Sequence, residues 1–175
     1  CQLDSSIEDA LPQARRLDRF CKAYDMLAIL NIKPIGETSF SGKDTERVMQ
    51  RSGMRLGDQN IFHYYDPRNG RSQFSLANRY QPGYFSHTDL IAGSFWGLTM
   101  FMSIPRCTEP SKSFGEMLSV AEYLASELNG SLADPDSGQL SPAHLALIQR
   151  QVHGVGESMK RLGVTPGGEE ALRLF

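Results

Sequence analysis

Two short segments contain residue types that bind phosphate or metal ions in other proteins. Residues 36–44 (GETSFSGKD) resemble a phosphate-binding loop, but the spacing of the two glycines differs by one residue, and Asp44 replaces the hydroxyl that would ligate magnesium. Residues 134–138 (DPDSG) resemble the start of a calcium loop, but no bidentate glutamate follows at the twelfth position. We therefore interpret Ser41 as a helix cap and residues 134–138 as a turn, and we expect neither nucleotide nor calcium to bind.

The histidines and cysteines are the remaining candidates for metal binding and nucleophilic catalysis. They are His63, His87, His144, His153, Cys1, Cys21 and Cys107. The histidines lack the short spacings of zinc ligands, and His63 is expected at the rim of a sheet. No serine lies in a strand-turn-helix elbow, and neither Cys21 nor Cys107 has an evident histidine partner. We therefore expect a protein that is not an enzyme, with no cofactor, no metal and no small-molecule substrate.

The composition is that of one compact domain that does not bind nucleic acid. The chain has 175 residues, of which 40% are hydrophobic, enough to bury a core. Its 18 basic and 20 acidic residues give a net charge of -2, which provides no attraction for a phosphate backbone. The three cysteines are odd in number and far apart, which favours a reducing compartment.

The beginning of the chain and its hydropathy bear on targeting. The sequence starts with Cys1 instead of methionine, so we interpret it as a fragment of a longer protein; no signal peptide supports a lipid-modified cysteine. No window approaches the eighteen or more consecutive apolar residues of a membrane span. We therefore expect this chain itself to make no membrane contact.

Hydrophobic periodicity, capping residues and turn residues predict an α+β domain. The predicted helices occupy residues 12–23, 42–52, 113–130 and 141–163, the last two with capping residues at Ser113 and Ser141. The predicted strands occupy residues 25–33, 55–65, 73–80 and 97–104, with two short edge strands at 131–133 and 139–140. The first of these strands reads as buried on both faces. These elements divide the chain into a helical extension (1–24), a domain (25–163) and a frayed tail (164–175).

The alternation of side chains along the strands raises a question about the second face of the sheet. Alternation places four side chains of the hairpin on the same face, where they would form the core beneath the helices: Phe62, Tyr64, Phe74 and Leu76. The opposite parity also collects apolar side chains: Leu27, Ile29, Ile61, Ala77, Thr99 and Phe101. That second face is either covered by the N-terminal helix, paired with a second copy in a homodimer, or open as a docking groove. A sheet that stacks single-stranded RNA on aromatic side chains is a further alternative, although Phe101 is the main aromatic residue facing outward.

Three motifs resemble a known family. They are residues 57–63 (GDQNIFH), residues 74–78 (FSLAN) followed by Pro82-Gly83, and residues 99–102 (TMFM) with Pro105 after them. In order and in spacing they are similar to the C-terminal FtsZ-binding domain of ZipA proteins, over roughly residues 26–154.

The resemblance implies a fold, a partner and a place in the cell. The implied fold is an α/β two-layer sandwich, with a six-stranded antiparallel sheet and three helices on one face, to which this chain adds an extra N-terminal helix. The implied partner is the C-terminal peptide of FtsZ, bound in a shallow hydrophobic groove. The implied location is the cytoplasmic face of the bacterial inner membrane at the division site, where the domain tethers the division ring through an anchor outside this chain.

The resemblance also implies the residues of the groove. These are Leu27, Ile29, Gln59, Ile61, Ala77, Arg79, Gln81, Thr99 and Phe101. Gln59 and Arg79 stand where the family pattern has methionines, and Gln81 stands where it has a lysine. The implied groove is therefore more polar than the family pattern, although the methylene stem of Arg79 can still lie on apolar surface.

Overall fold

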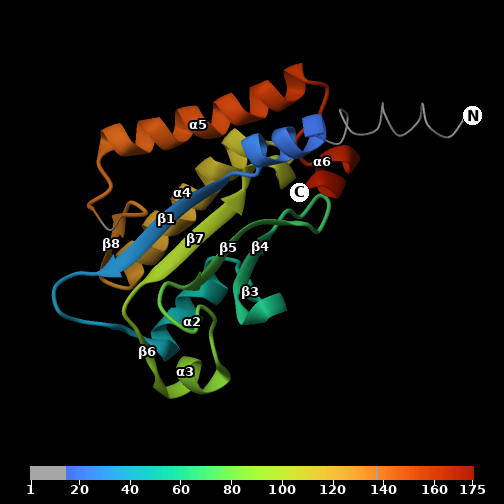
Figure 1. Cartoon of the computed structure of the whole chain (residues 1–175). Helices are drawn as coiled ribbons and strands as arrows, with labels where there is room; N and C mark the ends of the chain where they lie inside the picture. The colour runs from blue at the N-terminus through green and yellow to red at the C-terminus, as the bar shows by residue number, and fades with distance from the viewer. Residues whose placement is uncertain (1–14, 137) are drawn as a thin grey trace, which may run out of the picture.

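Six strands form one antiparallel sheet in the computed structural model, which describes residues 15–136 and 138–175 (Figure 1). The strands are β1 Leu27–Pro34, β3 Arg55–Leu56, β4 Phe62–Tyr65, β5 Ser72–Asn78, β7 Leu98–Ser103 and β8 Gly130–Ala133. Their order across the sheet is β3-β4-β5-β7-β1-β8. The predicted class, an α+β domain with a six-stranded antiparallel sheet, is confirmed.

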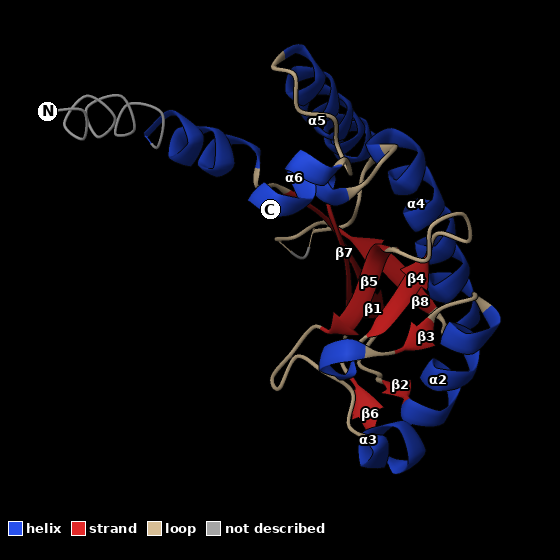
Figure 2. Cartoon of the chain, turned by 90° about the vertical axis from the view of Figure 1, so that its right-hand side faces the viewer, coloured by secondary structure: helices blue, strands red, loops and turns tan. Residues whose placement is uncertain are grey.

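Three long helices lie on one face of this sheet (Figure 2). They are α2 Gly42–Arg51, α4 Pro110–Glu127 and α5 Pro142–Arg161. Smaller elements are α3 His87–Ala92, α6 Glu169–Leu174, the helix at residues 15–24, the 3-10 turns η1 Asp58–Asn60 and η2 Ile104–Arg106, and a second small sheet of β2 Phe40–Ser41 and β6 Ser94–Phe95. The helix at 15–24 agrees with the prediction for 12–23 where the structure describes it; residues 12–14 lie outside the described residues.

The core lies between the sheet and the long helices. One row of side chains crosses four neighbouring strands, because Leu30 pairs with Met100, Met100 with Leu76, and Leu76 with Phe62. Each of these side chains is at most 1% exposed. Successive side chains of a strand alternate between its faces, so this row fixes which residues point away from the helices.

Two of the three predicted helix caps are present. The Ser41 and Ser141 hydroxyls accept hydrogen bonds from main-chain N–H groups in the first turns of α2 and α5. The prediction of a cap at Ser113 is wrong: α4 begins at Pro110, and the buried Ser113 hydroxyl donates to Gln73 Oε1 at 2.8 Å. A proline suits the first turn of a helix, because its missing N–H would have no partner there.

Three further sequence predictions need correction. The strand expected over 55–65 is interrupted by η1, where Gln59 and Asn60 have positive φ angles of 60° and 55°. The strand β1 is not buried on both faces, because Leu27 is 52% exposed. The tail is not frayed, since residues 169–174 form α6.

The tail is held by a second, small hydrophobic cluster. Its centre consists of Met159 of α5, Val164 of the connecting loop, and Ala171 of α6. Three aromatic side chains from both ends of the chain pack against this centre: Phe20, Tyr24 and Phe175. Gly167 is required here: its φ angle is +68°, and a Cβ atom would lie 2.6 Å from the main-chain nitrogen of Thr108. The helix at 15–24 and α6 therefore dock at one end of the sheet and do not lie across it (Figure 2).

The turn between β4 and β5 is closed by a nearly buried carboxylate. The Asp66 side chain is 5% exposed and accepts hydrogen bonds from the main-chain N–H of Arg68 at 2.9 Å and from its Nη2 at 2.9 Å. These bonds, the side-chain bond first, hold the pKa of the Asp66 carboxyl below its usual range. Arg68 also donates to Glu109 Oε2 at 2.9 Å, so the turn is tied to the start of α4.

We expect Asp66 to make the fold sensitive to acid. Because the pKa of Asp66 is lower in the folded chain than in the unfolded chain, its stabilisation is present above roughly pH 4 and is lost as pH falls through the folded pKa. The Asp66→Asn variant should therefore melt below wild type at neutral pH, with the gap in Tm narrowing in acid. Thermal unfolding across pH measures this; exposed Asp136→Asn is the control, and a gap that stays constant with pH contradicts the prediction.

Candidate functional site

The face of the sheet opposite the long helices presents a continuous row of side chains across four strands. Ile29 of β1 pairs with Phe101 of β7, Phe101 pairs with Ser75 of β5, and Ser75 pairs with His63 of β4. This row has the opposite parity to the core row described above. Ile29, Phe101 and His63 are half-buried and Ser75 is 8% exposed, so the face is partly open to solvent.

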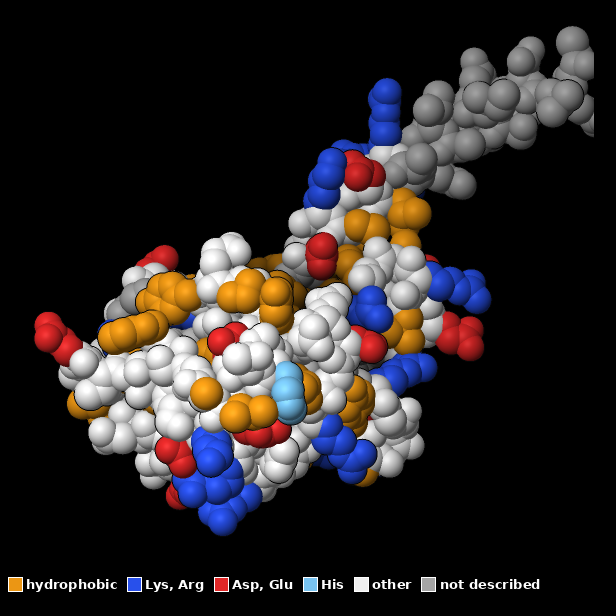
Figure 3. Space-filling model, turned by 90° about the horizontal axis from the view of Figure 1, so that it is seen from below, with side chains coloured by type: hydrophobic (Ala, Val, Ile, Leu, Met, Phe, Trp, Pro, Cys, Tyr) orange, Lys and Arg blue, Asp and Glu red, His pale blue; other side chains and the backbone are white. Residues whose placement is uncertain are grey.

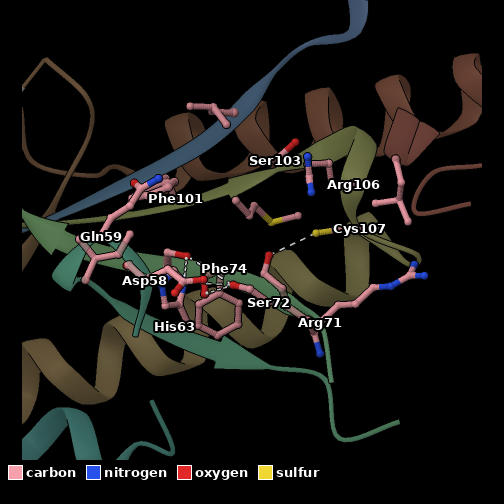
Figure 4. A pocket seen from close by; sticks show the side chains of 16 residues that line it. Asp58, Gln59, His63, Arg71, Ser72, Phe74, Phe101, Ser103, Arg106 and Cys107 are labelled. Atoms are coloured by element: carbon pink, nitrogen blue, oxygen red, sulfur yellow. Dashed lines mark hydrogen bonds between the residues drawn. The ribbon is translucent and has the colours of Figure 1, made fainter. Parts of the chain in front are cut away.

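A cavity of about 610 Å³ lies on this open face (Figure 4). Four of the predicted groove residues line it: Leu27, Gln59, Ile61 and Phe101. Leu27 is 52% exposed, whereas Ile61 is only 7% exposed. The volume lies in the range of sites that hold ligands in other proteins. The cavity is therefore large enough to take several side chains of a docked segment.

The floor of the cavity contains a fixed histidine. His63 Nε2 lies 3.1 Å from the main-chain oxygen of Asp58, and Nδ1 lies 2.8 Å from Ser75 Oγ. A carbonyl oxygen only accepts, so in the neutral ring Nε2 carries the proton and Nδ1 accepts from the Ser75 hydroxyl. The expectation that His63 sits at the rim of the sheet is wrong. His63 lies between two neighbouring strands and pairs with Arg55 of β3 on one side and with Ser75 of β5 on the other.

A buried amide closes one side of the open face. Asn31 of β1 is 3% exposed; its Nδ2 donates to the main-chain oxygen of Asp134 at 2.9 Å, and its Oδ1 accepts from the Thr99 hydroxyl at 2.7 Å. A buried amide needs such partners, because an unpaired one would cost free energy on folding. The start of the turn that follows β8 is therefore tied to β1 at this position.

Among the other predicted groove residues, Ile29, Ala77 and Thr99 lie on the same face but outside the cavity lining. Ala77 and Thr99 form a cross-strand pair one row beyond Phe101, and Ile29 adjoins Phe101 in the register. Arg79 lies after the end of β5, where its N–H donates to the Gly97 oxygen at 3.0 Å and its guanidinium lies 5.8 Å from the centre of the Tyr80 ring. Gln81 is exposed in the loop that follows.

The loop end of the face is rich in exposed apolar side chains. Tyr80, Tyr84, Ile91 and Trp96 are each more than 40% exposed, and Trp96, the one tryptophan of the sequence, is 60% exposed. On the side of the molecule that carries α3 and β6, hydrophobic side chains are scattered among polar ones (Figure 3). Arg79 and Gln81 therefore belong to a region of mixed apolar and polar character.

Several residues that line the cavity were missed by the sequence predictions. They are His63, Arg71, Ser72, Ser75, Ser103, Arg106 and Leu172. His63, Ser75 and Ser103 have the same strand parity as Phe101, so alternation alone would have found them. Arg71, Arg106 and Leu172 had no such signal, because α6 brings Leu172 to the sheet from far along the chain.

The described residues contain no arrangement that holds a metal ion. No group of three or more His, Cys, Asp or Glu side chains gathers among residues 15–136 and 138–175. Burial raises the pKa of the Cys107 thiol to about 11, and its sulfur lies 3.2 Å from the main-chain oxygen of Gln73, so the thiol stays protonated at neutral pH. Within the same part of the chain, no helix has the length and hydropathy needed to span a membrane.

Fold and face together define a class of protein: a two-layer α+β sandwich whose helices cover one face of an antiparallel sheet and leave the other partly open. Residues 26–151 match the family described as "ZipA, C-terminal FtsZ-binding domain". This chain belongs to that family.

Curated relatives support the assignment. The chain is 33% identical to the cell division protein ZipA of Vibrio campbellii over 126 residues, which are 71% of this chain and 39% of the relative. It is 30% identical to ZipA of Vibrio cholerae over 150 residues, 85% of this chain and 49% of the relative. It is 34% identical to ZipA of Pseudomonas aeruginosa over 119 residues, 67% and 41% of the two chains. The chain thus spans less than half the length of these relatives.

Proposed function

We propose that this chain binds the C-terminal peptide of FtsZ on the open face of its sheet, in the groove that the cavity occupies. In this proposal the domain works at the cytoplasmic face of the bacterial inner membrane at the division site. There it tethers the division ring through an anchor outside this chain. The observation that carries the proposal is the group of apolar side chains, Leu27, Ile29 and Phe101, on a face that the chain's own helices leave partly open, in a member of the FtsZ-binding family.

The groove would bind the peptide mainly by burying apolar surface. Leu27, Ile29, Ile61, Ala77 and Phe101 supply that surface, and Phe101 lies at its centre because it pairs with Ile29 on one side and Ser75 on the other. Aromatic side chains at the centre of an interface usually carry a large share of the binding free energy. Gln59 in the cavity lining would add hydrogen-bonding groups, and so would Thr99 beside Phe101, because the Thr99 hydroxyl already donates to Asn31 and can still accept.

Isothermal titration of the full chain with a synthetic FtsZ C-terminal peptide tests this proposal. We expect saturable one-to-one binding, with a negative heat-capacity change from apolar burial. A scrambled peptide of the same composition is the control, and equal binding of both peptides would refute specific recognition. Light scattering of the free chain tests the alternative that a second copy covers the face, because a dimer in solution would leave no groove to fill.

The RNA alternative receives little support from the positions of the aromatic side chains. Phe62 and Phe74 are each 1% exposed on the helix-covered side of the sheet, so they cannot stack bases. The aromatic groups in the four-strand row on the open face are thus Phe101 and the His63 ring, and both are half-buried.

The Arg79→Met variant should separate charge from apolar contact at the loop end of the groove. Methionine keeps the flexible apolar stem but removes the guanidinium, so binding should depend less on salt while its apolar part is kept or improved. The expected change in affinity at moderate salt is small, about 3-fold or less in either direction. Titration at two ionic strengths measures it, and an unchanged salt dependence would place the Arg79 charge outside the interface.

A further inference from the structure

We propose that Arg71 and Arg106 form a carboxylate-binding subsite at the α6 end of the groove, which receives acidic side chains of the bound segment. This inference rests on the proposed function, because it concerns the same groove and the same peptide. It adds a second recognition element, of a different chemistry, to the apolar strip around Phe101.

Both arginines line the cavity, at the end away from Gln59 and Phe101 (Figure 4). Arg71 Nη1 donates to the main-chain oxygen of Gly167 at 3.0 Å, and Arg106 Nη1 donates to the main-chain oxygen of Phe175 at 2.9 Å. Each guanidinium has five N–H donors, so these single bonds position the groups and leave donors for a ligand. The two side chains are exposed and hence accessible to a ligand from solvent.

Among residues 15–136 and 138–175, no Asp or Glu side chain forms a salt bridge with the guanidinium of Arg71 or of Arg106. Nearby Arg68 shows the contrast, because it is paired with both Asp66 and Glu109. Two guanidiniums without an Asp or Glu partner at one end of a cavity favour an anionic group, and their planar geometry suits a carboxylate.

The distribution of charge along the cavity gives the bound segment a direction. The one carboxylate of the lining residues, Asp58, belongs to η1 beside Gln59, at the far end from the arginines. The hydroxyls of Ser72 and Ser103 and the ring of His63 provide further polar groups in the lining. A segment with its acidic residues at the arginine end and its apolar residues over Phe101 would match both the charge and the polarity of the cavity.

Part of the subsite comes from outside the region that matches the family. Gly167, Leu172 and Phe175 lie beyond residues 26–151, and they supply a wall of the cavity and the two oxygens that position the guanidiniums. Gly167 is itself anchored, because its N–H donates to the Pro105 oxygen at 2.8 Å. The C-terminal segment therefore acts as a support for the arginines.

Titration with two peptides tests the subsite. One is the FtsZ C-terminal peptide, and the other is the same peptide with its Asp and Glu side chains replaced by Asn and Gln. For the acidic peptide at low ionic strength, we expect the double variant Arg71→Gln/Arg106→Gln to weaken binding by roughly 10-fold. For the amide peptide the same variant should change binding by less than about 2-fold. Arg150→Gln, an exposed arginine on α5, is the matched control and should leave both affinities unchanged.

The possible outcomes separate the subsite from the proposed function. The subsite is refuted if the double variant keeps wild-type affinity for the acidic peptide while Phe101→Ala loses it; the proposed function then stands. An equal loss for both peptides also refutes it, because a charge-specific contact must distinguish them. If wild type binds neither peptide better than a scrambled one, the proposed function fails and the subsite fails with it. Thermal unfolding of the double variant verifies that it is folded.

Discussion

The Phe101→Ala variant is expected to bind the FtsZ C-terminal peptide roughly 10- to 100-fold more weakly than wild type while remaining folded. Burying one phenylalanine side chain against a ligand is worth about 1.5–3 kcal/mol, and Phe101 lies at the centre of the open-face row. The fold should survive because the side chain points away from the helices. Isothermal titration gives the affinity, and chemical denaturation gives the stability.

A matched variant makes the binding prediction sharp. Leu147 is 45% exposed on α5, on the helix side of the molecule, so Leu147→Ala removes an exposed apolar side chain away from the groove. This variant should bind the peptide as wild type does. If folded Phe101→Ala also keeps wild-type affinity, the peptide binds elsewhere and the groove proposal is wrong.

The neighbouring substitution Met100→Ala should have the opposite consequence. Met100 is fully buried between Leu30 and Leu76 in the core row, so the truncation leaves a cavity and should lower the free energy of unfolding by about 2–5 kcal/mol. Where the variant is still folded, its peptide affinity should be near that of wild type. Urea denaturation measures the loss of stability.

The comparison of the two adjacent residues is itself the test of the sheet's geometry. Phe101→Ala should lower the free energy of unfolding by less than Met100→Ala does, because Phe101 is half-buried whereas Met100 is fully buried. Equal destabilisation by both substitutions would mean that the two faces of β7 are equally buried, which contradicts the register described here.

Much of the sheet was predictable because alternation is a local property. The parity of Met100 and Phe101 follows from their positions in one strand, and the turn residues between β4 and β5 fix the hairpin that brings Phe74 beside Tyr64. The same rule would have placed His63 and Ser75 on the open face. The family resemblance added the implied fold, a six-stranded antiparallel sheet with three helices on one face.

The parts that the sequence did not predict depend on contacts between distant segments. The helix α6 is six residues long and forms where Ala171 packs against Met159, a contact that no periodicity of the tail reveals. The positive φ angles of Gln59 and Asn60 break a strand that residue types alone favoured. Ser113 resembles a helix cap in sequence, but Gln73 from a different element binds its hydroxyl.

The exposed side chain of Trp96 gives this protein a built-in optical reporter. It is the one tryptophan in the chain, it is 60% exposed, and it precedes Gly97, whose main-chain oxygen binds the N–H of Arg79 at the loop end of the groove. An indole in water emits at longer wavelengths than one covered by apolar groups. A partner that extends over this end should therefore shift the emission to the blue, whereas a partner confined to the arginine end should leave the spectrum unchanged. The emission spectrum thus shows how far along the face an occupant reaches, without any added label.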